Sequence, residues 1–183
     1  MKEIRENSYL CKLKSRVAQI LAPQPKYKYN MSESKGGKQD TNKQEVLDKR
    51  YLRMAEIWAE NSYCIRRKVG AIIVKNSMII SDGFNGTPSG FENVCEDEDG
   101  ITKPYVLHAE ANAITKVARS NNSSEGSTLY ITASPCLECS KLIIQAGITR
   151  VVFNDLYRLA DGIDLLKRAG VECVHIPDED AER

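Results

Sequence analysis

The sequence predicts an α/β domain with a mixed central sheet of about five strands, covered by helices on both faces. Short β-branched runs recur along the chain, and amphipathic segments separate most of them. The first two runs adjoin and indicate a hairpin, and the later strands alternate with helices, which is typical of a mixed sheet. The 183 residues are enough for one hydrophobic core and few for two.

The composition divides the chain into a tail, one domain and a short C-terminal segment. Residues 1–43 are predicted to form a flexible tail, because most of them are polar and offer little apolar surface to bury. A weakly amphipathic run within residues 1–22 could form a short helix there. Residues 44–177 carry the periodic segments, and residues 178–183 form a C-terminal tail. An alternative for the first thirty residues is that they are not natural coding sequence.

The elements follow in order from their periodicity. Helices are expected at 44–63, 108–120, 135–147 and 160–169, and strands at 69–75, 78–82, 128–133, 150–153 and 171–176. In the first helix one apolar stripe is expected to face the core: Leu47, Tyr51, Met54, Ala55 and Trp58. Asn76-Ser77 joins the hairpin strands, a glycine-rich loop follows at 83–90, and residues 91–105 are acidic and irregular.

Two short motifs carry the candidate chemistry. The first is His108-Ala109-Glu110, and the second is Pro135-Cys136-Leu137-Glu138-Cys139. Imidazole and thiolate suit Zn²⁺, and three protein ligands with one open position make a catalytic zinc site. H-x-E followed by P-C-x-x-C is an established signature of zinc-dependent nucleobase deaminases, in which the glutamate carries protons and binds no metal. We therefore expect His108, Cys136 and Cys139 to hold zinc and Glu110 to be catalytic.

The cysteine pair is expected at the start of a helix. Residues three apart in the first turn project to one side, and the helix N-terminus favours thiolates. An alternative is a closed structural site, which needs a fourth ligand. His175 is the one other histidine of the chain, and it lies on a late strand.

Composition constrains the partners. The net charge of +1 combines +6 in residues 1–50 (12 basic, 6 acidic) with −5 in residues 51–183 (14 basic, 19 acidic). An acidic catalytic part argues against a nucleic acid strand and favours a small-molecule substrate. No apolar run is long enough for a membrane span, and the N-terminus lacks the pattern of a secretory signal, so the cytoplasm is expected. The six cysteines are accordingly expected to be reduced.

Four motifs between about Leu47 and Ile176 resemble those of the deoxycytidylate deaminases within the cytidine deaminase-like superfamily. They are Cys64-x-Arg66-x-x-Val69-Gly70-Ala71, Gly83-Phe84-Asn85-Gly86-Thr87-Pro88, His108-Ala109-Glu110-x-Asn112-Ala113-Ile114, and Ser134-Pro135-Cys136-x-x-Cys139 with Leu142-Ile143-x-x-x-Gly147-Ile148. The resemblance implies a three-layer α/β/α sandwich and one zinc-dependent activity. That activity is hydrolysis of dCMP to dUMP and ammonia, which supplies dUMP for thymidylate synthesis.

The resemblance also implies roles for individual residues. Asn85 would bind the sugar hydroxyl, the Ala109 N–H the base carbonyl and the Ser134 carbonyl the exocyclic amine. The remaining substrate contacts would come from Thr87 and from a phosphate group of three residues, Arg66, Tyr157 and Arg158. An alternative for both arginines is a solvated surface role.

Regulation and assembly are implied by the resemblance alone. Members of this family are usually homo-oligomers, often hexamers, activated by dCTP and inhibited by dTTP. The effector site would include Gly83, Phe84, Asn85 and Gly86.

Some relatives carry a second, structural zinc near the positions of Cys64 and Cys95, but no histidine here completes such a site. We therefore expect two buried free thiols. Two further alternatives stay open: another cytosine or adenine nucleoside, nucleotide or tRNA as the substrate, and a catalytically idle zinc-binding subunit. Retention of Glu110 counts against the idle subunit.

Overall fold

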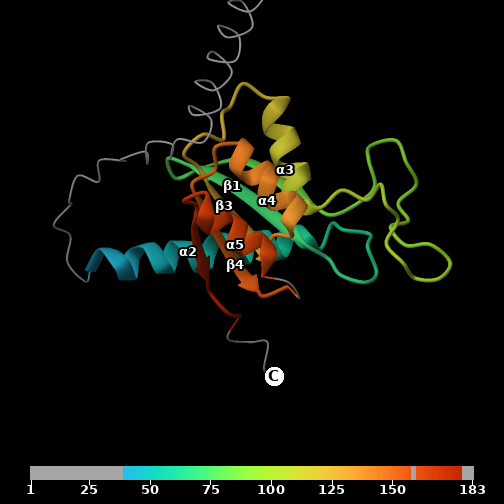
Figure 1. The fold of residues 1–183 in the computed structure, drawn as a ribbon, viewed down its shortest axis with the longest axis horizontal. Coiled ribbons are helices and arrows are strands. Elements are labelled where there is room, and N and C mark those ends of the chain that lie inside the picture. Colours follow the sequence, from blue (N-terminus) through green and yellow to red (C-terminus); the bar gives the residue numbers. More distant parts are fainter. Residues whose placement is uncertain (1–38, 158–159, 179–183) are drawn as a thin grey trace, which may run out of the picture. The chain divides into compact units, whose positions relative to one another are not determined.

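The computed structural model describes residues 39–157 and 160–178, drawn in Figure 1. Its elements run in the order α2 (Gln39–Ala59), β1 (Gly70–Lys75), β2 (Met78–Phe84), α3 (Ala109–Ala118), β3 (Thr128–Ala133), α4 (Leu137–Gln145), β4 (Arg150–Asp155), α5 (Asp161–Arg168) and β5 (Glu172–His175). The five strands form one sheet in the order β2-β1-β3-β4-β5. β1 is antiparallel to β2 and β3, and β3, β4 and β5 are parallel. The predicted mixed sheet is confirmed.

The hairpin between β1 and β2 closes as predicted at Asn76 and Ser77. Their φ angles are 50° and 62°. Two successive positive φ angles are typical of a type I′ turn, whose twist matches that of the two strands. The sequence Asn-Ser is compatible with this turn because Asn tolerates the left-handed region better than most residues.

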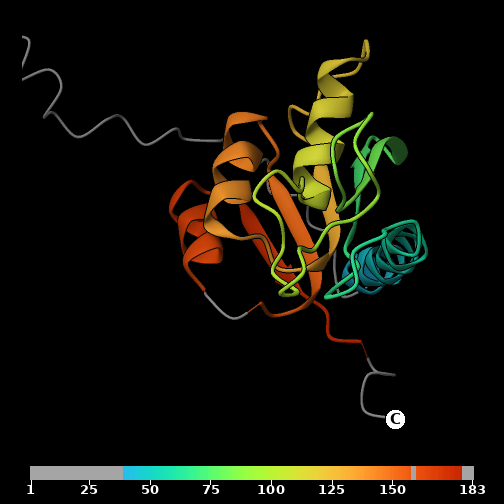
Figure 2. The same cartoon turned by 90° about the vertical axis from the view of Figure 1, so that its right-hand side faces the viewer.

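Each face of the sheet packs against its own helices, and Figure 2 shows α2 on one side with α4 and α5 on the other. Successive side chains of each strand point alternately to these two faces. One set of side chains points toward α3, α4 and α5: Ala71, Ile73, Leu129, Ile131, Val151 and Phe153. Toward α2 point Ile72, Val74, Tyr130 and Val152, which pack with Leu52 and Ala55. This alternation places two apolar layers around the sheet and confirms the α/β/α arrangement.

The predicted core stripe of α2 was right for Ala55, which is buried, and for Tyr51, which packs against the core, but wrong for Met54 and Trp58. Met54 is exposed and 38% of Trp58 is accessible, whereas Asp48, Leu52, Ala55 and Ala59 are buried. These four residues lie at i, i+4, i+7 and i+11, so they form a regular stripe, rotated from the predicted one. The pattern was missed because its first member is an aspartate.

Asp48 is buried because it is the centre of a hydrogen-bonded network on the α2 face. Arg150 binds it through both guanidinium ends at 2.9 and 2.7 Å, and the Tyr130 hydroxyl donates to it at 2.8 Å. Gln44 donates a further hydrogen bond at 2.9 Å. Burial alone would raise the pKa of Asp48, but these hydrogen bonds outweigh it and hold the pKa below its ordinary value of 3.8. The network fixes α2 to β3 and β4.

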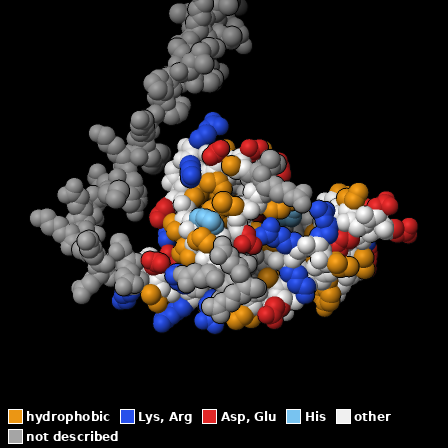
Figure 3. Space-filling view, turned by 90° about the horizontal axis from the view of Figure 1, so that it is seen from below, with side chains coloured by type: hydrophobic (Ala, Val, Ile, Leu, Met, Phe, Trp, Pro, Cys, Tyr) orange, Lys and Arg blue, Asp and Glu red, His pale blue; other side chains and the backbone are white. Residues whose placement is uncertain are grey.

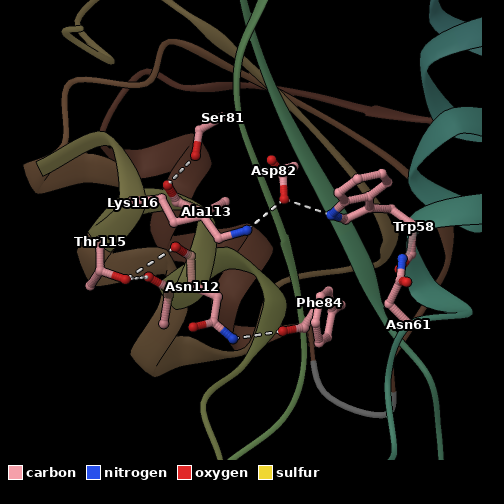
Figure 4. Close-up of polar contacts among 10 residues, drawn as sticks. Trp58, Asn61, Ser81, Asp82, Phe84, Asn112, Ala113, Thr115 and Lys116 are labelled. Atoms are coloured by element: carbon pink, nitrogen blue, oxygen red, sulfur yellow. Dashed lines mark hydrogen bonds and ion pairs between the residues drawn. The ribbon is translucent and has the colours of Figure 1, made fainter. Parts of the chain in front are cut away.

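Helix α3 docks on the edge strand β2 through the polar contacts of Figure 4. The Asn112 side chain donates to the Phe84 carbonyl at 2.6 Å, and the Ser81 hydroxyl donates to the Ala113 carbonyl at 2.7 Å. Asp82 accepts from Lys116 of α3 and also from the indole N–H of Trp58, both at 2.6 Å. Trp58 therefore tethers the end of α2 to β2 at the surface.

Several boundaries differ from the predicted ones: α2 ends at Ala59 and not near Tyr63, and β4 continues to Asp155 and not Phe153, while two further differences affect the predicted tail and loop. Helix α2 begins at Gln39, five residues before the predicted start at Gln44, so the last residues of the predicted tail are helical. β2 continues to Phe84, so Gly83 and Phe84 are strand residues and the loop begins at Asn85. The possible helix within residues 1–22 and most of the two predicted tails lie outside the described residues.

We predict that Asp48→Asn destabilises the domain by about 3 kcal/mol, because it leaves the largely buried Arg150 guanidinium with the exposed Glu172 as its remaining acidic partner. Urea unfolding followed by circular dichroism measures this. Glu45→Gln on the same helix is the matched control, since Glu45 is exposed and forms a surface ion pair with Lys49. The depressed pKa also predicts that the wild-type stabilisation is present above about pH 4 and is lost as the pH falls through the lowered value. Equal midpoints for the two variants would contradict the network's role.

Candidate metal centre and pocket

The two motifs meet because two helices start at neighbouring places. His108 is the N-cap of α3, and Cys136 is the N-cap of α4, which follows directly from the end of β3. Cys139 lies in the first turn of α4 and is buried. The backbones of both caps are extended, so their side chains leave the helices at the N-terminal ends. The two cysteines are three residues apart, so both sulfurs lie on one side of α4, as expected.

The three side chains form a group that fits a metal ion. His108 Nδ1 lies 3.5 Å from Cys136 Sγ and 3.4 Å from Cys139 Sγ. All three ligand atoms lie within 4.8 Å of one another, and no second such group occurs in the described residues. A tetrahedral zinc ion, with bonds of about 2.1 Å to nitrogen and 2.3 Å to sulfur, holds these atoms about 3.6 Å apart. The donor set and its spacing therefore fit zinc with one position left for a further ligand.

The charges of the group also favour a cation. Hydrogen bonds from Cys139 and His108 lower the pKa of Cys136 to about 3. The hydrogen bond to this thiolate raises the pKa of Cys139, and the contact with Cys136 raises the pKa of His108. The three groups thus share protons that a bound ion would replace, as metal binding to thiolates and imidazole requires.

Glu110 lies in the first turn of α3, beside the group and not within it. Only 4% of its surface is exposed. Burial raises the pKa of its carboxyl from 4.5 to about 7, although the neighbouring His108 acts in the opposite direction. A carboxyl with a pKa near neutrality both accepts and releases a proton readily at physiological pH.

A cavity of about 370 Å³ opens over the group and is the right size for a nucleotide. It is lined by Cys64, Arg66, Arg67, Val69, Asn85, Glu96, Thr102, Val106, His108, Ala109, Glu110, Ala133, Ser134, Cys136, Leu156 and Tyr157. The cavity therefore joins the metal-type group and the carboxyl of Glu110 to two guanidinium groups.

The expected substrate residues divide into three groups. Asn85, Ala109, Ser134, Arg66 and Tyr157 line the cavity. Thr87, by contrast, is not a lining residue, and its hydroxyl donates to the carbonyl of Glu92 at 2.8 Å. Arg158 lies outside the described residues.

Of the expected effector residues, Asn85 alone lines the cavity. Its side chain is also structural. Asn85 Oδ1 accepts from the Val69 N–H, and Nδ2 donates to the Arg67 carbonyl, both at 2.8 Å. Each side-chain group keeps capacity for one further hydrogen bond.

Two charged lining residues were not predicted from the sequence, Arg67 and Glu96. Arg67 forms an ion pair with Asp155 at 2.7 Å, and its guanidinium carbon lies 5.8 Å from the Tyr157 ring centre. The adjacent arginines at 66 and 67 were the available signal, and both line the cavity although Arg66 alone was expected to. Glu96 lies in the stretch 91–105, which was described only as acidic and irregular.

The expectation of free thiols at Cys64 and Cys95 was wrong. Both are buried, as predicted, but they form a disulfide with a Cα–Cα distance of 5.1 Å. The distance lies within the usual range for such a bond. The pair is 31 residues apart in sequence and is brought together only by the packing of two loops, so its spacing carried no signal.

Comparison with known proteins identifies the relatives of this chain. Residues 45–155 match the family model described as "Cytidine and deoxycytidylate deaminase zinc-binding region". The deoxycytidylate deaminase of Enterobacteria phage T4 is 33% identical over 175 residues, covering 72% of this chain and 91% of that protein. The deoxycytidylate deaminase of Mycobacterium phage D29 is 37% identical over 120 residues, covering 58% of this chain and 92% of that protein.

Among solved structures, the chain resembles the dCMP deaminase of cyanophage S-TIM5 in complex with dCMP and dUMP. The TM-score is 0.70 and the identity 51%, over 72% of this chain and 97% of that chain. At 51% identity, the two chains are similar in amino-acid sequence as well as in fold.

We predict about one zinc ion per chain in purified protein. The Cys139→Ala protein should lose most or all of its zinc, because the two remaining ligands hold the ion poorly. Elemental analysis by mass spectrometry gives the zinc content. Cys173→Ala is the matched control, because Cys173 is a free cysteine on β5 that does not line the cavity. Undiminished zinc in a folded Cys139→Ala protein would show that the ion binds elsewhere.

Proposed function

We propose that this chain, which belongs to the cytidine and deoxycytidylate deaminase family, hydrolyses dCMP to dUMP and ammonia. One observation carries the proposal: a single cavity combines the His-Cys-Cys group, the buried acid Glu110 and two arginines. The S-TIM5 relative, whose described complex contains dCMP and dUMP, supports the same substrate.

Zinc would be held by His108, Cys136 and Cys139, and when bound it supplies a water molecule of lowered pKa as the nucleophile. Glu110 accepts a proton from that water and delivers it to N3 of the cytosine as C4 is attacked. It then transfers the second proton of the water to the exocyclic amine. The C4–N bond breaks and ammonia leaves, so that the water oxygen becomes the C4 carbonyl of dUMP. The raised pKa of Glu110 suits a group that takes and returns protons in one cycle.

The backbone around the motifs suits recognition of the base. The Ala109 N–H is the first in α3 and has no acceptor within the helix, so it is available to the base carbonyl. The Ser134 carbonyl is the proposed acceptor for the exocyclic amine. The Ser134 hydroxyl already accepts a hydrogen bond from the Tyr157 N–H at 2.7 Å, which holds the segments around Ser134 and Tyr157 together.

The 5′-phosphate is proposed to bind the guanidinium groups of Arg66 and Arg67. Arg66 is exposed and contacts Thr102 through Nη1 at 3.3 Å. Arg67 is oriented by Asp155 and Tyr157. Guanidinium groups bind phosphate in a bidentate manner, so two of them at one cavity favour a nucleotide over a free nucleoside.

A small nucleotide fits the surface better than a nucleic acid strand does. Basic and acidic side chains are interspersed on the face shown in Figure 3, whereas strand binding favours a basic stripe. In the described part of the chain, no helix combines the length and the apolar character that a membrane crossing requires.

Assembly into a homo-oligomer and control by nucleotides are proposed from the family resemblance. Asn85 links the two sites in this proposal, since it lines the cavity and directly follows Gly83 and Phe84. A ligand that moves this segment would change the affinity for substrate.

Glu110→Gln is predicted to keep zinc and lose turnover by about 10²–10⁴-fold, because the amide keeps the size of the side chain but transfers no proton. Conversion of dCMP is followed by chromatography, and zinc content by elemental analysis. The matched control is Glu138→Gln, an exposed acid between the two cysteine ligands that pairs with Lys141 and does not line the cavity. Loss of zinc in Glu110→Gln would mean that Glu110 is a ligand and the site a structural one.

We predict that dCTP lowers the dCMP concentration for half-maximal rate by about 5-fold or more, and that dTTP opposes it. Linkage requires that an unreactive dCMP analogue tighten dCTP binding by the same factor, which calorimetry can measure. Hyperbolic kinetics that respond to neither nucleotide, with no dCTP binding, would remove regulation from the proposal and leave deamination untouched.

A further inference from the structure

Glu96 is a buried acid that the proposed chemistry leaves without a role. It is 6% exposed and lines the same cavity as Glu110. Its Oε1 accepts hydrogen bonds from the backbone N–H groups of Ile65 and Arg66 at 3.1 and 3.2 Å. Its Oε2 is shielded from solvent and meets no donor in the described parts of the chain. Such a group is unfavourable and calls for a functional explanation.

The segment that carries Glu96 is fixed in the cavity wall. The disulfide joins Cys95 to Cys64, and the Lys103 N–H donates to the Cys95 carbonyl at 2.8 Å. Two N–H groups hold Oε1 in place, so Oε2 is the oxygen left over. The terminal torsion of glutamate is broad, so a small adjustment can turn Oε2 to a ligand that fills the cavity.

We propose that Glu96 Oε2 accepts a hydrogen bond from the 3′-hydroxyl of the deoxyribose and thereby recognises a sugar that carries this hydroxyl. This inference rests on the proposed deamination of dCMP. A cytosine nucleotide at neutral pH offers donors of two kinds, the exocyclic amine and the sugar hydroxyl. The amine leaves during the reaction and must lie at the end of the cavity that holds His108 and Glu110. The hydroxyl is the donor that remains for Glu96, and its oxygen can still accept a hydrogen bond from Nδ2 of Asn85, the residue expected to bind the same hydroxyl.

The position of Glu96 agrees with the sugar side of the cavity. Its disulfide-linked neighbour Cys64 lies beside Asn85, with Cys64 Sγ 3.7 Å from the Asn85 carbonyl oxygen, and Ser62 donates to the same carbonyl at 2.7 Å. The phosphate is excluded from this place, because a carboxylate repels it. The guanidinium of Arg66 offers it a favourable position nearby.

The test compares dCMP with 2′,3′-dideoxycytidine monophosphate, which lacks the hydroxyl. For wild type we expect kcat/KM to be about 10- to 100-fold lower on the dideoxy analogue, the range for a hydrogen bond to a charged acceptor. In Glu96→Gln the amide oxygen remains with the two backbone N–H groups, so an NH₂ group replaces Oε2. The discrimination ratio should then fall at least about 5-fold. Glu98→Gln, exposed and two residues on in the same loop, should keep the wild-type ratio.

Each outcome decides. A wild type that converts both nucleotides equally well, or a folded Glu96→Gln protein with an unchanged ratio, overturns the inference and leaves the deaminase proposal intact. No conversion of dCMP by the zinc-loaded wild type overturns the proposed function and this inference with it. If Glu96→Gln does not fold, the 3′-amino analogue of dCMP gives the answer on wild type, because it restores a donor. Recovery of at least half of the lost kcat/KM supports the contact, and no recovery overturns it.

Discussion

The site depends on two places where helices approach the sheet and each other so closely that only glycine fits. A Cβ atom at Gly83 in β2 would collide with the backbone of Ala109 and Ala113 in α3. A Cβ atom at Gly162 in α5 would collide with the Pro135 carbonyl oxygen, immediately before the α4 cap. The first contact seats the helix that carries His108 and Glu110, and the second seats the segment that carries Cys136. The spacing of the metal-type group therefore follows from backbone packing that tolerates no side chain.

The two helix N-termini also set the electrostatics of the cavity. Their unpaired N–H groups and dipoles favour negative charge, which suits the Cys136 thiolate at one cap. In contrast, Glu110 is held where burial opposes its ionisation, so two acids at similar distances from helix ends receive opposite pKa shifts. A thiolate at a helix N-terminus suits the binding of a cation, and a carboxyl with a pKa near neutrality suits proton exchange. This division of roles is what hydrolytic deamination needs.

Much of the fold was predictable because its signals are local. The type I′ hairpin, the strand runs and the helix boundaries near His108 and Cys136 all follow from neighbouring residues. His108, Glu110, Cys136 and Cys139, which the structure brings to one cavity and metal-type group, were named from two motifs of three and five residues. The orientation of α2 was not predictable, because burial of Asp48 depends on Arg150, 102 residues away in sequence. Likewise, the disulfide and the burial of Glu96 arise from the packing of two loops, which no periodicity records.

The most direct test of the central claim is the kcat/KM of the zinc-loaded full chain for dCMP and for deoxycytidine, measured in one assay that separates products by chromatography. The account predicts formation of dUMP from dCMP, with kcat/KM about 100-fold or more above that for deoxycytidine, since the phosphate contacts of two arginines contribute to the transition state. Absence of dUMP, or equal rates on the nucleoside and the nucleotide, would contradict it.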